Sequence, residues 1–111
     1  MLYLVTTDHF SRSSPRTPEE TELLHEQVTT SIEILSKLES KGKILAGGVI
    51  SAQRKHIFII DAESNDEVTE LVQRLPFWIE HQWEILPLET WGHYLDFLTQ
   101  YREEMGLKYL I

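Results

Sequence analysis

The sequence predicts one α+β domain over residues 1–111, with the ferredoxin-like element order βαββαβ and a further C-terminal helix. Two S/T-x-x-E capping boxes each precede an apolar stripe at helical spacing. Four short runs rich in β-branched and aromatic residues read as strands, and Gly or Pro separates several elements. A chain of 111 residues has room for one hydrophobic core, so we expect a single domain.

The first half predicts a strand, a long helix and a hairpin. The run at 1–7 is a strand, and the Ser/Arg/Pro stretch at 11–16 is a loop. A helix begins after the cap residue Thr17, continues over 18–41 and stops at Gly42. The run at 43–51 and the run at 56–60 form two hairpin strands.

Two glycines interrupt the first hairpin strand. Gly in a strand interior marks a bulge or the close approach of other atoms to the backbone. We expect Gly48 of this pair to resist substitution by a β-branched residue such as Val, although Val is the better strand former.

The second half predicts a helix, a strand and a final helix. Ser64-Asn65-Asp66-Glu67 opens the second helix, which ends at Pro76. The segment at 82–90 is the fourth strand, and an amphipathic pattern predicts a third helix over 91–104.

Both faces of the predicted sheet are apolar. Period-two alternation places one set of side chains on one face: Leu2, Leu4, Ile44, Ile50, Phe58, Ile60, Trp83 and Ile85. The opposite face then carries Tyr3, Val5, Leu45, Val49, Ile57, Ile59, Leu86 and Leu88. Leaving eight such side chains in water would cost about 1.5 to 3 kcal/mol each. We therefore expect a homodimer, or a larger even-numbered assembly, in which a second copy covers this face.

Composition excludes several functions. The net charge is −8, and the ten Lys and Arg residues are scattered, which disfavours nucleic acid and anionic membranes as partners. The sequence has no Cys and no His pair at metal-ligand spacing, so we expect no metal and no cofactor. We expect no signal peptide and no membrane span, and therefore a cytoplasmic protein.

Four segments together resemble a known superfamily. They are the opening MLYLV, LESKGKILAGGVIS, FIIDAESNDEVTELV and LPFWIEHQWEILPL. Over residues 1–88 the chain resembles the dimeric α/β-barrel superfamily, and within it the muconolactone isomerase-like and YCII-related families. The resemblance implies two sheets packed face to face in a homodimer, and a small-molecule pocket lined by sheet and helix residues.

The resemblance also bears on site residues. Where YCII-related proteins carry a His on the first helix and an Asp before Pro-Phe, this chain has Ser31 and Leu75. The match to muconolactone isomerases is best around Phe77 and at Glu84. We therefore place Ser31, Phe77, Trp78 and Glu84 among the candidate substrate-binding residues.

The candidate catalytic residues are His9 and His81. His9 lies where the first strand enters its loop, and His81 follows the Phe77-Trp78 turn. Imidazole has a pKa near neutrality and suits general acid or base catalysis. Ser31 is a polar residue on the buried stripe of the first helix, where it either bonds to the carbonyl four residues earlier or lines a pocket.

The expected function is isomerase-like: proton transfer, without a cofactor, on a lactone or related ring compound. One alternative is a ligand-binding or assembly protein of the same fold that lacks catalysis. A second is a cofactor-free monooxygenase. No GxSxG, Walker or GxGxxG motif is present to support covalent hydrolysis or nucleotide binding.

Overall fold

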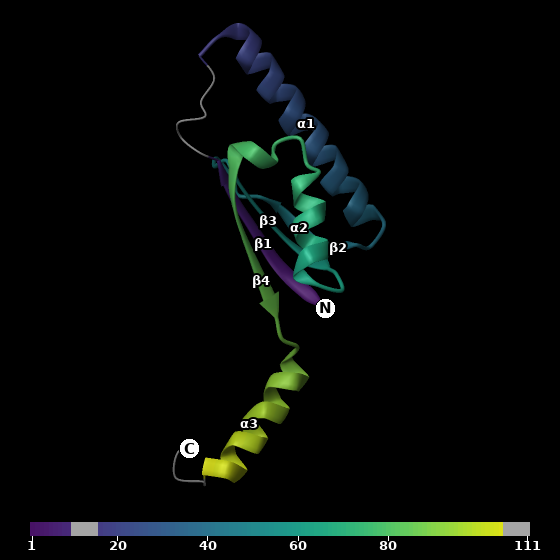
Figure 1. The fold of residues 1–111 in the computed structure, drawn as a ribbon, viewed down its shortest axis with the longest axis vertical. Helices are drawn as coiled ribbons and strands as arrows, with labels where there is room; N and C mark the ends of the chain where they lie inside the picture. Colours follow the sequence, from purple (N-terminus) through teal and green to yellow (C-terminus); the bar gives the residue numbers. More distant parts are fainter. Residues whose placement is uncertain (10–15, 106–111) are drawn as a thin grey trace.

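The computed structural model describes residues 1–9 and 16–105, which form four strands, three α-helices and one short 3₁₀-helix (Figure 1). Most of the loop expected at 11–16 lies outside the described residues. The elements are β1 (Leu2–His9), α1 (Pro18–Ser40), β2 (Ile44–Val49), β3 (Lys55–Asp61), α2 (Asn65–Gln73), η2 (Trp78–Glu80), β4 (His81–Leu88) and α3 (Trp91–Met105). The predicted ferredoxin-like order with an extra helix is confirmed.

Both predicted capping boxes start their helices. The Thr17 hydroxyl accepts a hydrogen bond from the Glu20 N–H at 3.1 Å, and the Ser64 hydroxyl accepts one from the Glu67 N–H at 3.2 Å. Each bond satisfies a helix N–H that has no carbonyl partner in the first turn. The first helix ends before Gly42, whose φ of +80° continues the chain out of the helix.

The four strands form one antiparallel sheet in the order β2-β3-β1-β4. Helices α1 and α2 lie on one face of this sheet, and none of the described helices lies on the other face (Figure 1). We call that uncovered side the open face. Its members on β1, β3 and β4 include Leu4, Ile57, Ile59 and Leu86, and Ile57 and Leu86 are exposed. Both faces are therefore apolar, as the sequence predicted.

The prediction of which β1 side chains share a face with Phe58 and Ile60 was wrong. Tyr3 and Val5, not Leu2 and Leu4, join Phe58 and Ile60 in the core, because Val5 pairs with Phe58 and Tyr3 with Ile60. Every residue from Leu2 to Val5 is apolar or aromatic, so alternation along β1 alone does not choose a face.

A bulge in β2 changes the side of the sheet to which the following side chains point. Ile44 pairs with Ile60 but Ala46 pairs with Ile59, so the register slips by one residue. Beyond the slip, Val49 pairs with His56 and turns to the helix side, opposite to its predicted face. An extra residue in one strand reverses the parity of every residue after it.

Helix α3 lies beyond the end of β4 and away from the sheet (Figure 1). The molecule is correspondingly long, 65 × 30 × 24 Å, with a radius of gyration of 18.8 Å against about 13 Å for a compact chain of this length. Trp91 is 89% exposed and Leu95 is 61% exposed. Within residues 1–9 and 16–105 no helix is both long and apolar enough to cross a membrane.

Candidate functional site

Two histidines lie on the helix-covered face at one end of the sheet. His56 is the second residue of β3 and His81 is the first residue of β4, with β1 between the two strands. Their rings are 5.5 Å apart between centroids and nearly perpendicular, at 64°. Both side chains are buried, at 7% and 5% exposure. The buried Phe77 ring packs against both, with centroids 5.2 Å from His56 and 4.3 Å from His81.

The tautomer of the neutral His81 ring follows from its backbone partner. Its Nδ1 is 2.9 Å from the carbonyl oxygen of Phe77, four residues earlier. A carbonyl only accepts, so Nδ1 carries the hydrogen of that bond. In the neutral ring the lone pair is then on Nε2, which is the atom that can take a proton.

Ser31 fixes that backbone partner. Its hydroxyl donates to the Gln27 carbonyl at 2.7 Å and accepts the Phe77 N–H at 3.0 Å. Ser31 is fully buried, and its bond to the Phe77 N–H is shielded from water. A continuous chain of hydrogen bonds therefore runs from α1 through Ser31 and Phe77 to the imidazole of His81.

His56 has a different environment. Its Nδ1 is buried and has no hydrogen-bond partner, and the same is true of the Thr7 hydroxyl. Thr7 and His56 are direct cross-strand partners on β1 and β3, so their side chains leave the same face of the sheet. Burial, and secondarily the nearby charge of His81, lowers the pKa of His56 below 6.5. His56 is therefore neutral at pH 7.

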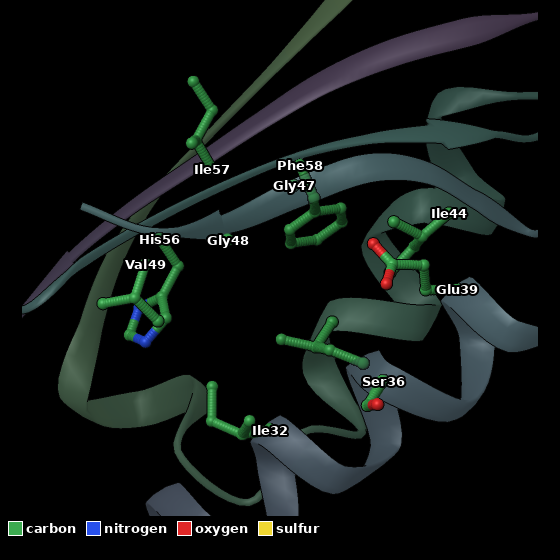
Figure 2. A pocket seen from close by; sticks show the side chains of 11 residues that line it. Ile32, Ser36, Glu39, Ile44, Gly47, Gly48, Val49, His56, Ile57 and Phe58 are labelled. Carbon is green, nitrogen blue, oxygen red and sulfur yellow. The ribbon is translucent and has the colours of Figure 1, made fainter. Parts of the chain in front are cut away.

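Three hollows include His56 in their lining, and two of them also include residues of α1. The larger of these two, the α1 cleft, has a volume of about 550 Å³ and is lined by residues that include Leu24, Val28, Ile32, Val49, His56 and His81. The smaller, the apolar cavity, has a volume of about 170 Å³, and its lining includes Ile32, Leu35, Ile44, Val49, His56 and Phe58. Figure 2 shows the His56 ring directed from the sheet toward Ile32 on α1, beside Val49. A cleft of this size suits a small-molecule ligand.

The structure brings some of the sequence-predicted site residues together. Phe77 and Ser31 both support His81, and the bond from Ser31 to the carbonyl four residues earlier is present. Trp78 is 36% exposed, and its carbonyl oxygen accepts the indole N–H of Trp83 at 3.0 Å.

Two other candidates stand apart from this cluster. Glu84 is exposed on the open face, because it alternates with Trp83 and Ile85 along β4. The backbone of His9 pairs with that of His81, but the His9 side chain lies outside the described part of the structure.

Sequence reasoning missed His56 as a site residue, and it did not place Thr7 beside His56. A signal for His56 was available, because it alternates with Phe58 and Ile60 and so shares their buried face. Nothing in the local sequence marks Thr7, whose partner is set by the β1–β3 register.

Comparison with known proteins gives a family and a fold. A sequence profile of the muconolactone delta-isomerase family matches residues 1–93. No curated protein sequence matches the chain. The crystal structure of a muconolactone isomerase superimposes with a TM-score of 0.66 at 16% identity, covering 81% of this chain and 90% of the isomerase.

A second solved structure has the same fold. It is 5-chloro-2-hydroxyhydroquinone dehydrochlorinase from Burkholderia phenoliruptrix AC1100, in complex with 2,5-dihydroxybenzoquinone. It superimposes with a TM-score of 0.58 at 23% identity, and the match covers 84% of this chain and 98% of the dehydrochlorinase. These two likenesses show the fold, in which helices cover one side of an antiparallel sheet.

Proposed function

Because the chain belongs to the muconolactone delta-isomerase family, we propose that it isomerises a lactone or related small ring compound by proton transfer without a cofactor. The observation that carries this proposal is His81, whose Nδ1–H is held by Phe77 and whose ring lines the α1 cleft. A base with a fixed tautomer beside a cleft of substrate size is what proton abstraction from carbon requires.

The proposed reaction needs no oxidant or reductant. His81 Nε2 takes a proton from the carbon next to the substrate carbonyl. The C–H electron pair forms a C=C bond, and the carbonyl π pair moves to the oxygen. The protonated His81 then returns the proton to the far carbon of the conjugated system, the carbonyl re-forms, and the product is an isomer of the substrate.

His9 is the alternative base. Its backbone lies opposite His81 at the end of the β1–β4 pair. The two histidines make different predictions: His81→Ala should lower kcat by about a hundredfold or more if His81 is the base, whereas His9→Ala should not. The reverse result would transfer the role to His9.

A substrate screen tests the function itself. We would incubate the protein with unsaturated lactones and small quinones, including the 2,5-dihydroxybenzoquinone bound by the dehydrochlorinase, and follow isomerisation and exchange of C–H for deuterium by NMR in D₂O. Exchange at a carbon next to a carbonyl, lost in His81→Ala, is the expected result. Binding without exchange for every compound would instead favour a ligand-binding protein.

We also propose that the protein works as a homodimer or a larger even-numbered assembly. The open face presents exposed apolar side chains that include Ile57 and Leu86, and α3 adds Trp91 and Leu95. A second copy burying these surfaces would recover the free energy that an isolated chain forfeits to water.

A further inference from the structure

We propose that Ser31 is the positioning residue for the base His81, whose ring it holds, through Phe77, at a fixed place relative to helix α1. Ser31 is not among the residues that line the α1 cleft, whereas His81 is. Ser31 therefore acts on the reaction through His81 and not through contact with the substrate. The inference rests on the proposed function, because it assigns a role in the proton transfer at His81.

The turn before β4 takes a hydrogen-bond acceptor from α1. Helix α2 ends at Gln73, and Pro76, which has no N–H, separates it from Phe77. The buried Phe77 N–H donates to the Ser31 hydroxyl, 46 residues earlier in the chain, at 3.0 Å. A buried N–H is rarely left unpaired, so this bond fixes the start of the turn to α1.

Phe77 connects this bond to His81. Its N–H is held by Ser31, and its carbonyl oxygen lies 2.9 Å from Nδ1 of His81. We call these two hydrogen bonds the anchor. The Phe77 ring is fully buried, and its centroid is 4.3 Å from that of the His81 ring. A displacement of Phe77 therefore moves both the hydrogen-bond acceptor and the ring that His81 contacts.

The anchor fixes the direction of the basic nitrogen, because the two nitrogens of an imidazole lie on different edges of the ring. With Nδ1–H bonded to the Phe77 carbonyl, the lone pair of the neutral His81 ring is on Nε2. Without that bond the ring can flip about its Cβ–Cγ bond and can exchange tautomers. Either change removes the lone pair from the position where the substrate C–H must lie.

Helix α1 carries both the anchor and one wall of the cleft. Val28 and Ile32 line the cleft from α1, and Ser31 is the residue immediately before Ile32. The Ser31 hydroxyl also donates to the Gln27 carbonyl at 2.7 Å, so its own helix fixes its orientation. The separation between His81 and a substrate that rests on this wall is therefore set within one helix. A misplacement of about 1 Å costs on the order of a hundredfold in rate.

The anchor is tested first without any substrate. Protein labelled with ¹⁵N in its histidines is observed by NMR at about pH 8.5, where an imidazole with its ordinary pKa of about 6.5 is neutral. The spectrum separates protonated from lone-pair nitrogens. We expect His81 to be Nδ1–H in the wild type, and Ser31→Ala to raise its Nε2–H fraction. A wild-type ring that is Nε2–H, or an unchanged tautomer in folded Ser31→Ala, overturns the proposal.

Two control variants separate positioning from stability. Ser40→Ala removes the same kind of bond, from a hydroxyl to the carbonyl four residues earlier, but at an exposed site in the last turn of α1. Val68→Ala removes buried apolar contacts of α2 and lowers stability without removing a hydrogen bond of the anchor. Both should leave the His81 tautomer unchanged. A change in Val68→Ala as large as that in Ser31→Ala would show that lost stability alone moves the ring, which overturns the proposal.

Ser31→Cys covers the case in which Ser31→Ala does not fold. A thiol is close to a hydroxyl in size but accepts a hydrogen bond weakly, so this variant should keep the packing and weaken the bond to Phe77. The Nε2–H fraction of His81 should then lie above that of the wild type. A fraction equal to that of the wild type contradicts the proposal.

Kinetics of the proposed isomerisation separate positioning from substrate binding. Ser31→Ala should lower kcat by about ten- to a hundredfold and leave KM within about twofold of the wild-type value. A raised KM with unchanged kcat would place Ser31 in substrate binding and overturn the proposal.

The NMR measurements do not require turnover, so a failure of the proposed function is seen separately. If His81→Ala leaves the deuterium exchange intact while the Ser31 variants change the His81 tautomer, the proposed base is wrong and the anchor is right. If His81→Ala abolishes the exchange while the Ser31 variants leave both tautomer and kcat unchanged, the base is right and the anchor is wrong.

Discussion

Replacing Gly47 by Ala tests how closely β2 approaches β3. A Cβ built on Gly47 would lie 2.5 Å from Phe58 Cβ, 2.6 Å from the Ile57 carbonyl oxygen and 2.8 Å from Phe58 Cα. Carbon atoms in van der Waals contact are about 3.5–4.0 Å apart, so the strands must separate by about 1 Å. Two of the three obstructing atoms belong to the backbone and cannot move aside as a side chain can.

The neighbouring glycine is the matched control. A Cβ on Gly48 would meet nothing within 4 Å. The expectation that Gly48 is the constrained residue was therefore wrong, and the constraint lies at Gly47. The reason is the bulge, which brings Gly47 opposite Phe58 at the closest approach of the two strands.

The expected energies have opposite signs. Overpacking costs about 1–3 kcal/mol, and replacing Gly by Ala in a strand returns about 0.5–1 kcal/mol. Because two obstructing atoms are backbone atoms, the overpacking cost at Gly47 belongs to the upper part of that range, about 2–3 kcal/mol, and Gly47→Ala should be destabilised by about 1–2.5 kcal/mol. Gly48→Ala should be as stable as wild type or slightly more so. Urea denaturation at fixed protein concentration measures both, and the Gly47→Ala midpoint should fall by about 0.5–1 M. Equal midpoints for the two variants would refute the reasoning.

Three further predictions follow from buried polar contacts and from the open face. Ser31→Ala leaves the buried Phe77 N–H without an acceptor, so urea denaturation should show a loss of about 1–3 kcal/mol, whereas loss of Ser31 without cost would show that water replaces it. Burial lowers the pKa of His56, so below about pH 6.5 the imidazole takes up a proton in the unfolded chain more readily than in the folded one. The free energy of unfolding should therefore decrease as the pH is lowered below 6.5, and His56→Gln should make this decrease smaller. Ile59→Asp should dissociate or unfold the protein, because it places a charge on the open face. Light scattering should find an assembly for the wild-type protein. A wild-type monomer of 13.0 kDa at micromolar concentration would contradict the proposed dimer.

Only part of the candidate site could be predicted from the sequence. His81 was identified because it follows a turn at the start of a strand, where folds often place reactive side chains. The structure places it in the lining of the α1 cleft. The hydrogen bonds that give this ring its tautomer could not be read, because Ser31 and Phe77 are 46 residues apart. Glu84 was chosen because the resemblance to muconolactone isomerases is best there and around Phe77, but alternation along β4 puts its side chain on the face opposite to that of His81.

The sequence by itself determined the elements and their order. Capping residues Thr17 and Ser64 started both core helices, and the apolar runs became the four strands, since these are local preferences of a few adjacent residues. Only the tertiary structure decided which face of β1 is buried, where β2 slips its register, and that Thr7 lies opposite His56. These depend on strand pairing between segments far apart in the chain, and in strands that are apolar on both sides no local pattern favours one register over its neighbour.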